Sequence, residues 1–167
     1  MKSKHTMDDT LCIEKPNATD GSLMWQLVKQ STLDLNSPYK YIMMCEYFSE
    51  TCVVVKKNEQ LLGFITAFIP PKKQDVIFVW QVGVDPSQHG KGIASKMLAE
   101  LLKRDACKNV RYLEATVTPS NQASQSLFRG FARKKQTECV VKPCFSADLF
   151  PGENHEEELT FRVGPFI

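Results

Sequence analysis

The chain has 167 residues, of which 43% are apolar and 24% are charged, and its formal net charge at pH 7 is +2. This size and balance are typical of one soluble globular domain with a substantial core. The near-neutral charge argues against a nucleic-acid-binding protein, which usually carries a clustered basic face, and no apolar run approaches the ~20 residues of a membrane span.

Residues 1–12 are expected to form a flexible N-terminal tail, followed by a single domain over residues 13–167. The opening residues lack the apolar stretch of a secretory signal, so a cytoplasmic location is expected. The six cysteines contain no C-x-x-C pair and have no histidine beside them. We therefore expect reduced thiols and no metal site.

Two helices are predicted near the start of the domain. Asp20 is expected to cap a helix over residues 21–30. Ser37 followed by Pro38 indicates the start of a second helix. One face of this helix is expected to be buried, because apolar side chains recur at i, i+3, i+4 and i+7; they are Tyr41, Met44, Cys45 and Phe48.

A β-hairpin, a further strand and a helix are predicted next. Two apolar runs within residues 52–71 flank a turn at residues 57–60, as in a hairpin. Residues 75–84 predict a strand that is apolar on both faces and therefore central in its sheet. A helix is expected after Gly92.

The last third of the chain predicts three more strands and one helix. Residues 110–117 read as a strand and residues 120–132 as a short helix. Residues 134–141 are expected to form a strand, residues 142–154 an irregular loop, and residues 157–163 the final strand. Because strands occur both in pairs and alternating with helices, we expect an α/β fold with a mixed sheet and helices on both faces.

A glycine-containing loop links the strand over residues 75–84 to the following helix. Gly90 and Gly92 let the backbone approach a ligand closely. Free amides at a helix start, together with the helix dipole, favour phosphate binding, and Lys91 adds positive charge. The loop matches neither the Walker motif nor G-x-G-x-x-G. A surface turn with capping glycines is the alternative interpretation.

In its context, this loop resembles the acetyl-CoA pyrophosphate loop of the GNAT superfamily of N-acetyltransferases, whose pattern is [RQ]-x-x-G-x-[GA]. His89 stands where the family usually has Arg or Gln. Asn121 with Leu127 and Phe128 resembles the family's N-x-x-A-x-x-L-[YF] segment beside the pantetheine arm. The resemblance implies a GNAT fold, with a mostly antiparallel twisted sheet splayed at its central strand, and acetyl-CoA as cosubstrate.

The segments "LDLNSPYKY", "VWQVGVDP", "TVTPSNQASQSLF" and "HEEELTFRVGPF" are similar, more narrowly, to the diaminobutyrate acetyltransferases of ectoine biosynthesis. That resemblance implies acetyl transfer to the γ-amine of L-2,4-diaminobutyrate, a role in osmoprotection, and a homodimer. The residues then expected to bind acetyl-CoA are Val82, Gly83, Val84, His89, Gly90, Lys91, Gly92, Ile93, Ala94, Asn121, Ser124 and Phe128. The first three would act through their backbone, with Gly83 at a β-bulge.

The acid and base that many GNAT enzymes use are missing here. The strand over residues 75–84 has no carboxylate, and Phe128 occupies the usual Tyr position. The catalytic candidates are instead Asp34, Tyr39, Trp80, His155 and Glu158. Glu114, Thr116 and Glu157 are further candidates for binding the acceptor together with these residues. A buried carboxylate such as Glu114 needs a partner, and an acceptor ammonium is one.

Several candidates also have a plainer interpretation: helix capping for Asp34, packing for Tyr39, core packing for Trp80, strand formation for Thr116, and a solvated acidic face for residues 156–158. If residues 155–158 open the last strand, His155 and Glu157 share one face, while Glu156 and Glu158 share the other. The sequence leaves open which face meets the acceptor.

Two alternative functions remain at this point. The chain could be a GNAT enzyme that acts on another small amine or a protein amine, since acidic residues suit any cation. It could also be a catalytically silent sensor of acetyl-CoA, because both usual acid and base positions have changed.

Overall fold

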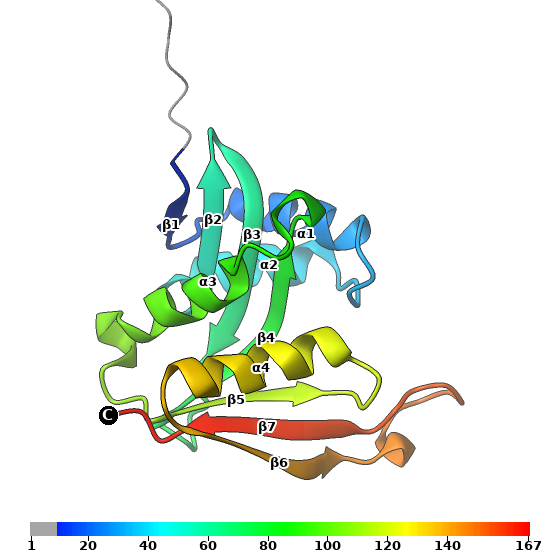
Figure 1. The fold of residues 1–167 in the computed structure, drawn as a ribbon. Helices are drawn as coiled ribbons and strands as arrows, with labels where there is room; N and C mark the ends of the chain where they lie inside the picture. The colour runs from blue at the N-terminus through cyan, green and yellow to red at the C-terminus, as the bar shows by residue number, and fades with distance from the viewer. Residues whose placement is uncertain (1–9) are drawn as a thin grey trace, which may run out of the picture. The chain divides into compact units, whose positions relative to one another are not determined.

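The computed structural model describes residues 10–167. Its helices and strands are β1 (Cys12–Glu14), α1 (Asp20–Lys29), α2 (Pro38–Tyr47), β2 (Val53–Lys57), β3 (Gln60–Phe68), β4 (Val76–Val84), α3 (Ile93–Leu102), β5 (Tyr112–Val117), α4 (Gln122–Lys134), β6 (Glu138–Phe145) and β7 (Glu158–Gly164) (Figure 1). The strands are hydrogen-bonded in the order β1-β2-β3-β4-β5-β7-β6. β4 pairs with β5 in parallel, whereas β1–β2, β2–β3, β5–β7 and β6–β7 are antiparallel. The expected mixed sheet is confirmed.

The described chain forms two compact units. The first comprises the described residues through Thr66 together with Gln81–Leu101. The second comprises Ala67–Trp80 and Leu102–Ile167. β3 and β4 each contribute residues to both units.

The first unit contains the predicted hairpin and a strand that the sequence did not reveal. Asn58 and Glu59 form the β2–β3 turn with φ values of 50° and 66°, as a two-residue hairpin turn requires. β1 pairs with β2, with Cys12 opposite Lys56. Cys12, which was expected to lie in a tail over residues 1–12, is instead the first residue of β1, and residues 1–9 lie outside the described part.

The two helix starts differ in how they are built. Ser37 caps α2 as predicted, accepting the Lys40 N–H at 3.3 Å. Asp20, however, is the first residue of α1 and not its cap. Its carboxylate is buried, accepts the Asn17 N–H at 2.9 Å and pairs with Lys56 Nζ at 2.7 Å. The side chain therefore ties the start of α1 to β2.

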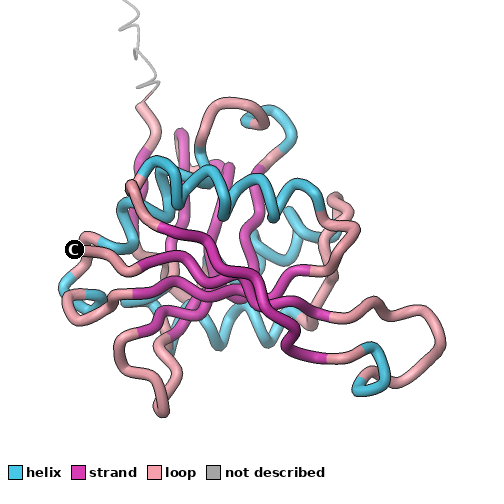
Figure 2. The backbone as a smooth tube through the Cα atoms, turned by 60° about the horizontal axis from the view of Figure 1, so that its bottom comes forward, coloured by secondary structure: helices cyan, strands magenta, loops and turns pink. Residues whose placement is uncertain are grey.

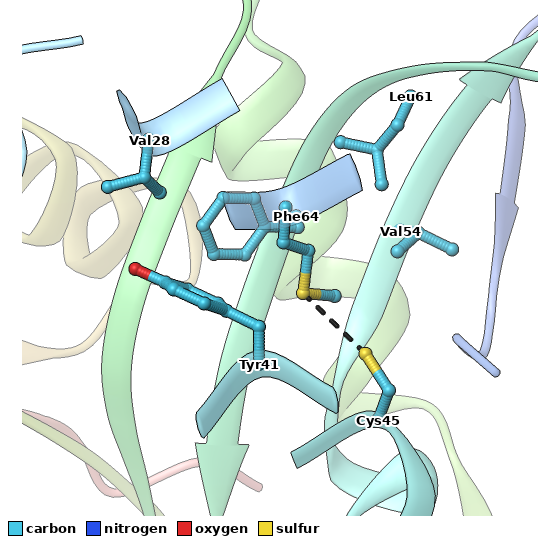
Figure 3. Packing of buried hydrophobic residues seen from close by; sticks show 7 residues of the cluster. Val28, Tyr41, Cys45, Val54, Leu61 and Phe64 are labelled. Carbon is cyan, nitrogen blue, oxygen red and sulfur yellow. Dashed lines mark hydrogen bonds between the residues drawn. The ribbon is translucent and has the colours of Figure 1, made fainter. Parts of the chain in front are cut away.

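The core of the first unit lies between α1, α2 and the sheet. Its cluster consists of Met24, Val28, Tyr41, Cys45, Val54, Leu61 and Phe64 (Figure 3). Three of the four predicted α2 positions are buried, but Phe48 is 38% exposed beyond the end of the helix. The other face of β3 meets α3, since a Cβ at Gly63 would lie 3.3 Å from Met97 Cε. Within this unit, helices thus cover both faces of β3.

In the second unit, α4 covers β5, β7 and β6 (Figure 1), with Phe131 and Phe161 fully buried. β4 pairs with β5 over Val76–Phe78, and the expected splay of the sheet at β4 stays a prediction.

The β6–β7 segment differs from its prediction. β6 runs to Phe145 and includes part of the expected loop, with Pro143 opposite Leu159. β6 ends the sheet order, and proline is tolerated in an edge strand. The connection from the end of β6 to the start of β7 appears as a long pink segment with one cyan turn in Figure 2. β7 begins at Glu158, so strand alternation does not assign faces to residues 155–157.

Candidate active site

The glycine loop begins where β4 ends, in the first unit. The Asp85 N–H donates to the Leu62 carbonyl at 2.8 Å and so keeps the strand end attached to β3. The Asp85 carboxylate accepts the Ser87 N–H at 2.9 Å and caps a short 3-10 helix, Pro86–Gln88. The hydrogen bonding from Ser87 lowers the pKa of Asp85. The entry to the loop is therefore fixed by the backbone and by one cap.

Gly90 and Gly92 are required for their backbone conformation. Their φ values are 78° and 73°, and residues that carry a Cβ rarely adopt such positive φ values. A Cβ at either position would meet no described atom within 4 Å, so packing does not demand glycine here. The open space and the positive φ values together suit a loop that receives a ligand along its backbone.

As at the start of any helix, the first backbone amides of α3 need hydrogen-bond acceptors from outside the helix. Lys96 N–H donates to the Gly92 carbonyl at 3.0 Å. The amides of Gly92, Ile93 and Ala94 precede this bond and have no acceptor within the helix. Together with the helix dipole and the Lys91 side chain, they form a site suited to a phosphate.

His89, in the position where the family usually has Arg or Gln, contacts the backbone at the end of β4. Its Nε2 lies 3.1 Å from the Val84 carbonyl, and because a carbonyl only accepts, Nε2 carries the proton. The ring therefore holds the loop to the end of β4. The expected contact of His89 with acetyl-CoA stays a prediction.

Gly83 has a packing reason to be glycine. A Cβ here would overlap the Phe64 ring and lie 3.1 Å from Leu27 Cδ2. The absence of a side chain lets Phe64 and α1 pack against β4. The expected bulge and the backbone contacts of Val82, Gly83 and Val84 with acetyl-CoA stay predictions.

Asp34 and Gln81 lie together in the first unit. Gln81 Nε2 donates to the Asp34 backbone carbonyl at 2.9 Å, and Gln81 Oε1 accepts from the Tyr41 hydroxyl at 2.8 Å. Ser37, not Asp34, caps α2, which leaves the exposed Asp34 carboxylate for another role. Tyr39, in the first turn of α2, is 72% exposed and is not a core residue.

Gln81 was not among the site residues predicted from the sequence. A signal was present, because Gln81 is the one amide side chain within the apolar run Val76–Val84. The hydrogen bond to Asp34 spans 47 positions, so the sequence did not indicate the partner.

Glu114 carries a buried charge in the second unit. The residue is 7% exposed, and its carboxylate contacts Lys73 Nζ at 3.3 Å and Arg162 NH1 at 2.9 Å. Arg162 also stacks on the Tyr112 ring at 3.7 Å. The cation that a buried carboxylate needs is thus supplied by the protein. A contact of Glu114 with the acceptor stays a prediction, as does that of Thr116, which faces Thr160 across β5 and β7.

The segment before β7 fixes the tautomer of His155. Its ring stacks on Phe150 at 3.7 Å, with 9° between the planes. His155 Nδ1 lies 2.5 Å from the Glu156 carbonyl, and this contact requires a proton on Nδ1. In the neutral ring, Nε2 is then the nitrogen that can accept a proton.

Glu156 ties this segment to the start of α4. Its carboxylate accepts from the Ser120 hydroxyl at 2.5 Å, just before Asn121 caps α4 by accepting the Ser124 N–H at 3.1 Å. Phe128, further along α4, is buried in the core. The contacts of Asn121, Ser124 and Phe128 with acetyl-CoA stay predictions.

The remaining acceptor candidates differ in exposure. Trp80 is 44% exposed, so the core interpretation does not apply to it. Glu157 is exposed, and Glu158 is half-buried as the first residue of β7. Asp34 and Tyr39 belong to the first unit, whereas Trp80, His155 and the three acids belong to the second.

Two features are absent from the described residues 10–167. No helix in this range is long and apolar enough to cross a membrane. The same range contains no group of three or more His, Cys, Asp or Glu side chains that could hold a metal ion.

Known proteins match the chain along nearly its whole length. The model of the acetyltransferase (GNAT) family matches residues 22–131. A protein of Halalkalibacterium halodurans named L-2,4-diaminobutyric acid acetyltransferase is 68% identical over 160 residues, covering 96% of this chain and 85% of that protein. The protein of the same name from Marinococcus halophilus is 66% identical over 158 residues, covering 95% of this chain and 92% of that protein.

A solved structure is also similar. Diaminobutyrate acetyltransferase EctA from Paenibacillus lautus, in complex with its substrate L-2,4-diaminobutyric acid and coenzyme A, matches with a TM-score of 0.91. It is 41% identical, and the match covers 96% of this chain and 98% of that chain.

Proposed function

This chain belongs to the acetyltransferase (GNAT) family, and on that premise we propose that it transfers the acetyl group of acetyl-CoA to the γ-amine of L-2,4-diaminobutyrate. The observation that carries the proposal is the 68% identity with the diaminobutyric acid acetyltransferase of Halalkalibacterium halodurans, which extends over 96% of this chain. The similarity therefore includes the segments outside the acetyl-CoA loop, where an acceptor would be selected.

The reaction has simple requirements. An aliphatic amine is mostly protonated at pH 7, so the γ-ammonium must first lose a proton. The neutral nitrogen attacks the thioester carbon to form the C–N bond, and it gives up a second proton as the C–S bond breaks. The released thiolate takes up a proton. The protein must therefore bind two charged substrates, accept a proton and stabilise the oxyanion.

The glycine loop is the proposed site for the pyrophosphate of acetyl-CoA. Gly90 and Gly92 give the loop two residues with positive φ, and the first amides of α3 add hydrogen-bond donors. Lys91 adds a positive charge. The cosubstrate then supplies the activated acetyl group.

His155 is the proposed proton acceptor. The carbonyl of Glu156 holds the proton on Nδ1, and the Phe150 ring fixes the plane of the imidazole. Nε2 is left as a basic nitrogen. In this role His155 would replace the strand carboxylate that many GNAT enzymes use and that this chain lacks.

Asp34 is the proposed partner of the α-ammonium group. Its carboxylate is exposed, and its backbone is fixed by Gln81. Binding the α-amine at Asp34 would leave the γ-amine to meet the thioester. The further residues proposed from the sequence to contact the acceptor are Tyr39, Trp80, Glu114, Thr116, Glu157 and Glu158.

An acceptor panel tests the proposal. Diaminobutyrate should be acetylated with the highest kcat/KM among diaminobutyrate, ornithine, lysine and a peptide with a free N-terminus. Preferred acetylation of the peptide would favour a protein amine as the acceptor. Binding of acetyl-CoA without transfer to any amine would favour the sensor function.

The cellular setting is part of the same proposal. We propose that the enzyme acts in the cytoplasm, in ectoine biosynthesis, as a homodimer. Sedimentation equilibrium measures the assembly directly: the expected mass is twice 18.9 kDa, and the mass of a single chain would contradict it.

A further inference from the structure

Gln81 uses both ends of its side-chain amide within the first unit. Nε2 donates to the backbone carbonyl of Asp34 at 2.9 Å. Oε1 accepts from the Tyr41 hydroxyl at 2.8 Å. One side chain in β4 thus joins the core to the segment that carries Asp34.

The two partners define the orientation of the amide. The carbonyl of Asp34 can only accept, so the NH₂ end of Gln81 must face it. The carbonyl end then faces Tyr41, whose hydroxyl donates to it. In the flipped orientation, two carbonyl oxygens would face each other without a proton between them.

Tyr41 is a rigid anchor for this arrangement. Its side chain is fully buried, and its ring packs edge-on against Phe64 with 6.1 Å between the ring centres. Figure 3 shows the ring inside the apolar cluster, with the hydroxyl oxygen directed away from Cys45. Because the ring is packed on all sides, the hydroxyl has a defined position from which to hold Gln81.

The segment that Gln81 holds has no regular secondary structure. It joins the end of α1 at Lys29 to the cap of α2 at Ser37. Near its start, Ser31 Oγ donates to Val28 O and accepts the Leu33 N–H. At Asp34, the bond from Gln81 attaches it to β4. Without this bond, the backbone at Asp34 would have more freedom between its two fixed ends.

We infer that Gln81 is a positioning residue for the acceptor, which fixes the backbone at Asp34 and thereby sets the length of diamino acid that the enzyme prefers. The inference rests on the proposed function, because it requires Asp34 to bind the α-ammonium of the acceptor. A carboxylate at a fixed position suits one separation between the two amines. A segment that can withdraw would accommodate an additional methylene group, as in ornithine.

The test compares three variants with the wild type. Gln81→Met keeps the length and volume of the side chain but removes both hydrogen bonds. Tyr41→Phe keeps the packed ring but removes the hydroxyl that orients the amide. Gln74→Met is the matched control, because exposed Gln74 also donates from Nε2 to a loop carbonyl, that of Pro71, at 2.9 Å.

Diaminobutyrate and ornithine compete for limiting acetyl-CoA in one reaction, and the ratio of acetylated products gives the ratio of kcat/KM. This ratio does not depend on the fraction of enzyme that is folded. Gln81→Met should shift it toward ornithine by about three- to ten-fold, the value of about one lost hydrogen bond, that to Asp34. Tyr41→Phe should shift it less, Gln74→Met should leave it unchanged, and the KM for acetyl-CoA should stay within about two-fold of the wild type.

An unchanged product ratio in Gln81→Met and Tyr41→Phe would overturn the inference while leaving the proposed function intact. If Gln81→Met gives no active enzyme, Tyr41→Phe decides alone. A wild type that acetylates neither amino acid would instead reject the proposed function. An Asp34→Ala variant with wild-type KM for diaminobutyrate would reject the link through Asp34.

Discussion

His155 donates its Nδ1 proton to the backbone carbonyl of Glu156, 2.5 Å away, and this bond leaves Nε2 as the proton-accepting nitrogen of the neutral ring. His155→Asn tests whether that nitrogen is the base. Asparagine can keep an N–H toward the carbonyl but has no equivalent of Nε2. We expect kcat to fall by about 10²- to 10⁴-fold, while the affinity for acetyl-CoA, measured by calorimetry, stays the same. A kcat close to that of the wild type would remove His155 from the proton transfer.

Gly92 offers a test of the pyrophosphate site in which backbone strain is controlled. Gly92→Ala and Gly92→Glu place a Cβ on the same backbone with φ of 73°, and no described atom lies within 4 Å to hinder it. The two variants therefore share the strain, but only Glu adds a negative charge. We expect Gly92→Glu to bind coenzyme A at least about ten-fold more weakly than Gly92→Ala, because like charges placed side by side repel strongly. Equal affinities by calorimetry would contradict the loop assignment.

Glu114 is expected to stabilise the second unit. Replacing it with Gln leaves Lys73 and Arg162 without their shared carboxylate, and losing a charged, mostly buried hydrogen bond costs about 1.5–3 kcal/mol. The melting temperature should fall by several degrees in calorimetry. Lys73→Met is the control, because Lys73 is 57% exposed and its loss leaves Arg162 in place, so its effect should be smaller. An unchanged melting temperature with a raised KM for diaminobutyrate would show that Glu114 serves the acceptor instead.

Lys40 gives the protein a predictable pH dependence. Burial lowers the pKa of this lysine to about 8, whereas an unfolded lysine titrates near about 10.4. Between these values the unfolded chain binds more protons than the folded chain, so the Lys40 contribution to stability improves as the pH rises. Below pH 8 the folded protein carries the full penalty of a buried charge.

Lys40→Met should therefore be more stable than the wild type at pH 7, and this difference should shrink as the pH approaches 10. The comparison of the two proteins isolates the effect of Lys40 from that of buried thiols such as Cys45. Burial raises the pKa of Cys45 to about 12, so its contribution to stability falls as the pH rises, whereas that of Lys40 improves. Urea unfolding at several pH values measures the difference. The exposed Lys72→Met variant is the control, and a difference that does not change with pH would contradict the prediction.

The parts of the fold that the sequence predicted have local causes. Ser37 and Pro38 define a helix start through one cap and one fixed dihedral. The hairpin turn was predictable because the polar residues 57–60 separate two apolar runs, and Asn58 and Glu59 form it. The glycine loop is visible because Gly90 and Gly92 both need positive φ values within a few residues of a helix start.

The parts that were missed depend on distant partners. β1 has three residues and is a strand because it pairs with β2. The end of β6 contains Pro143, which argues against a strand unless its position at the sheet edge is known. The contacts at the candidate site also join residues that are far apart in the sequence. Gln81 and Asp34 are separated by 47 positions, and Glu114 and Arg162 by 48. Residue types alone do not reveal such pairs.

The site of acetylation tests the central claim most directly. Wild-type enzyme is incubated with acetyl-CoA and L-2,4-diaminobutyrate, and the product is identified by proton and carbon NMR. If the acceptor is held by its α-amine at Asp34, as proposed, the acetyl group should appear on the γ-nitrogen, with one equivalent of free coenzyme A released. Acetylation mainly on the α-nitrogen would show that the acceptor binds in the reverse orientation, and the absence of any acetylated amino acid would contradict the proposed function.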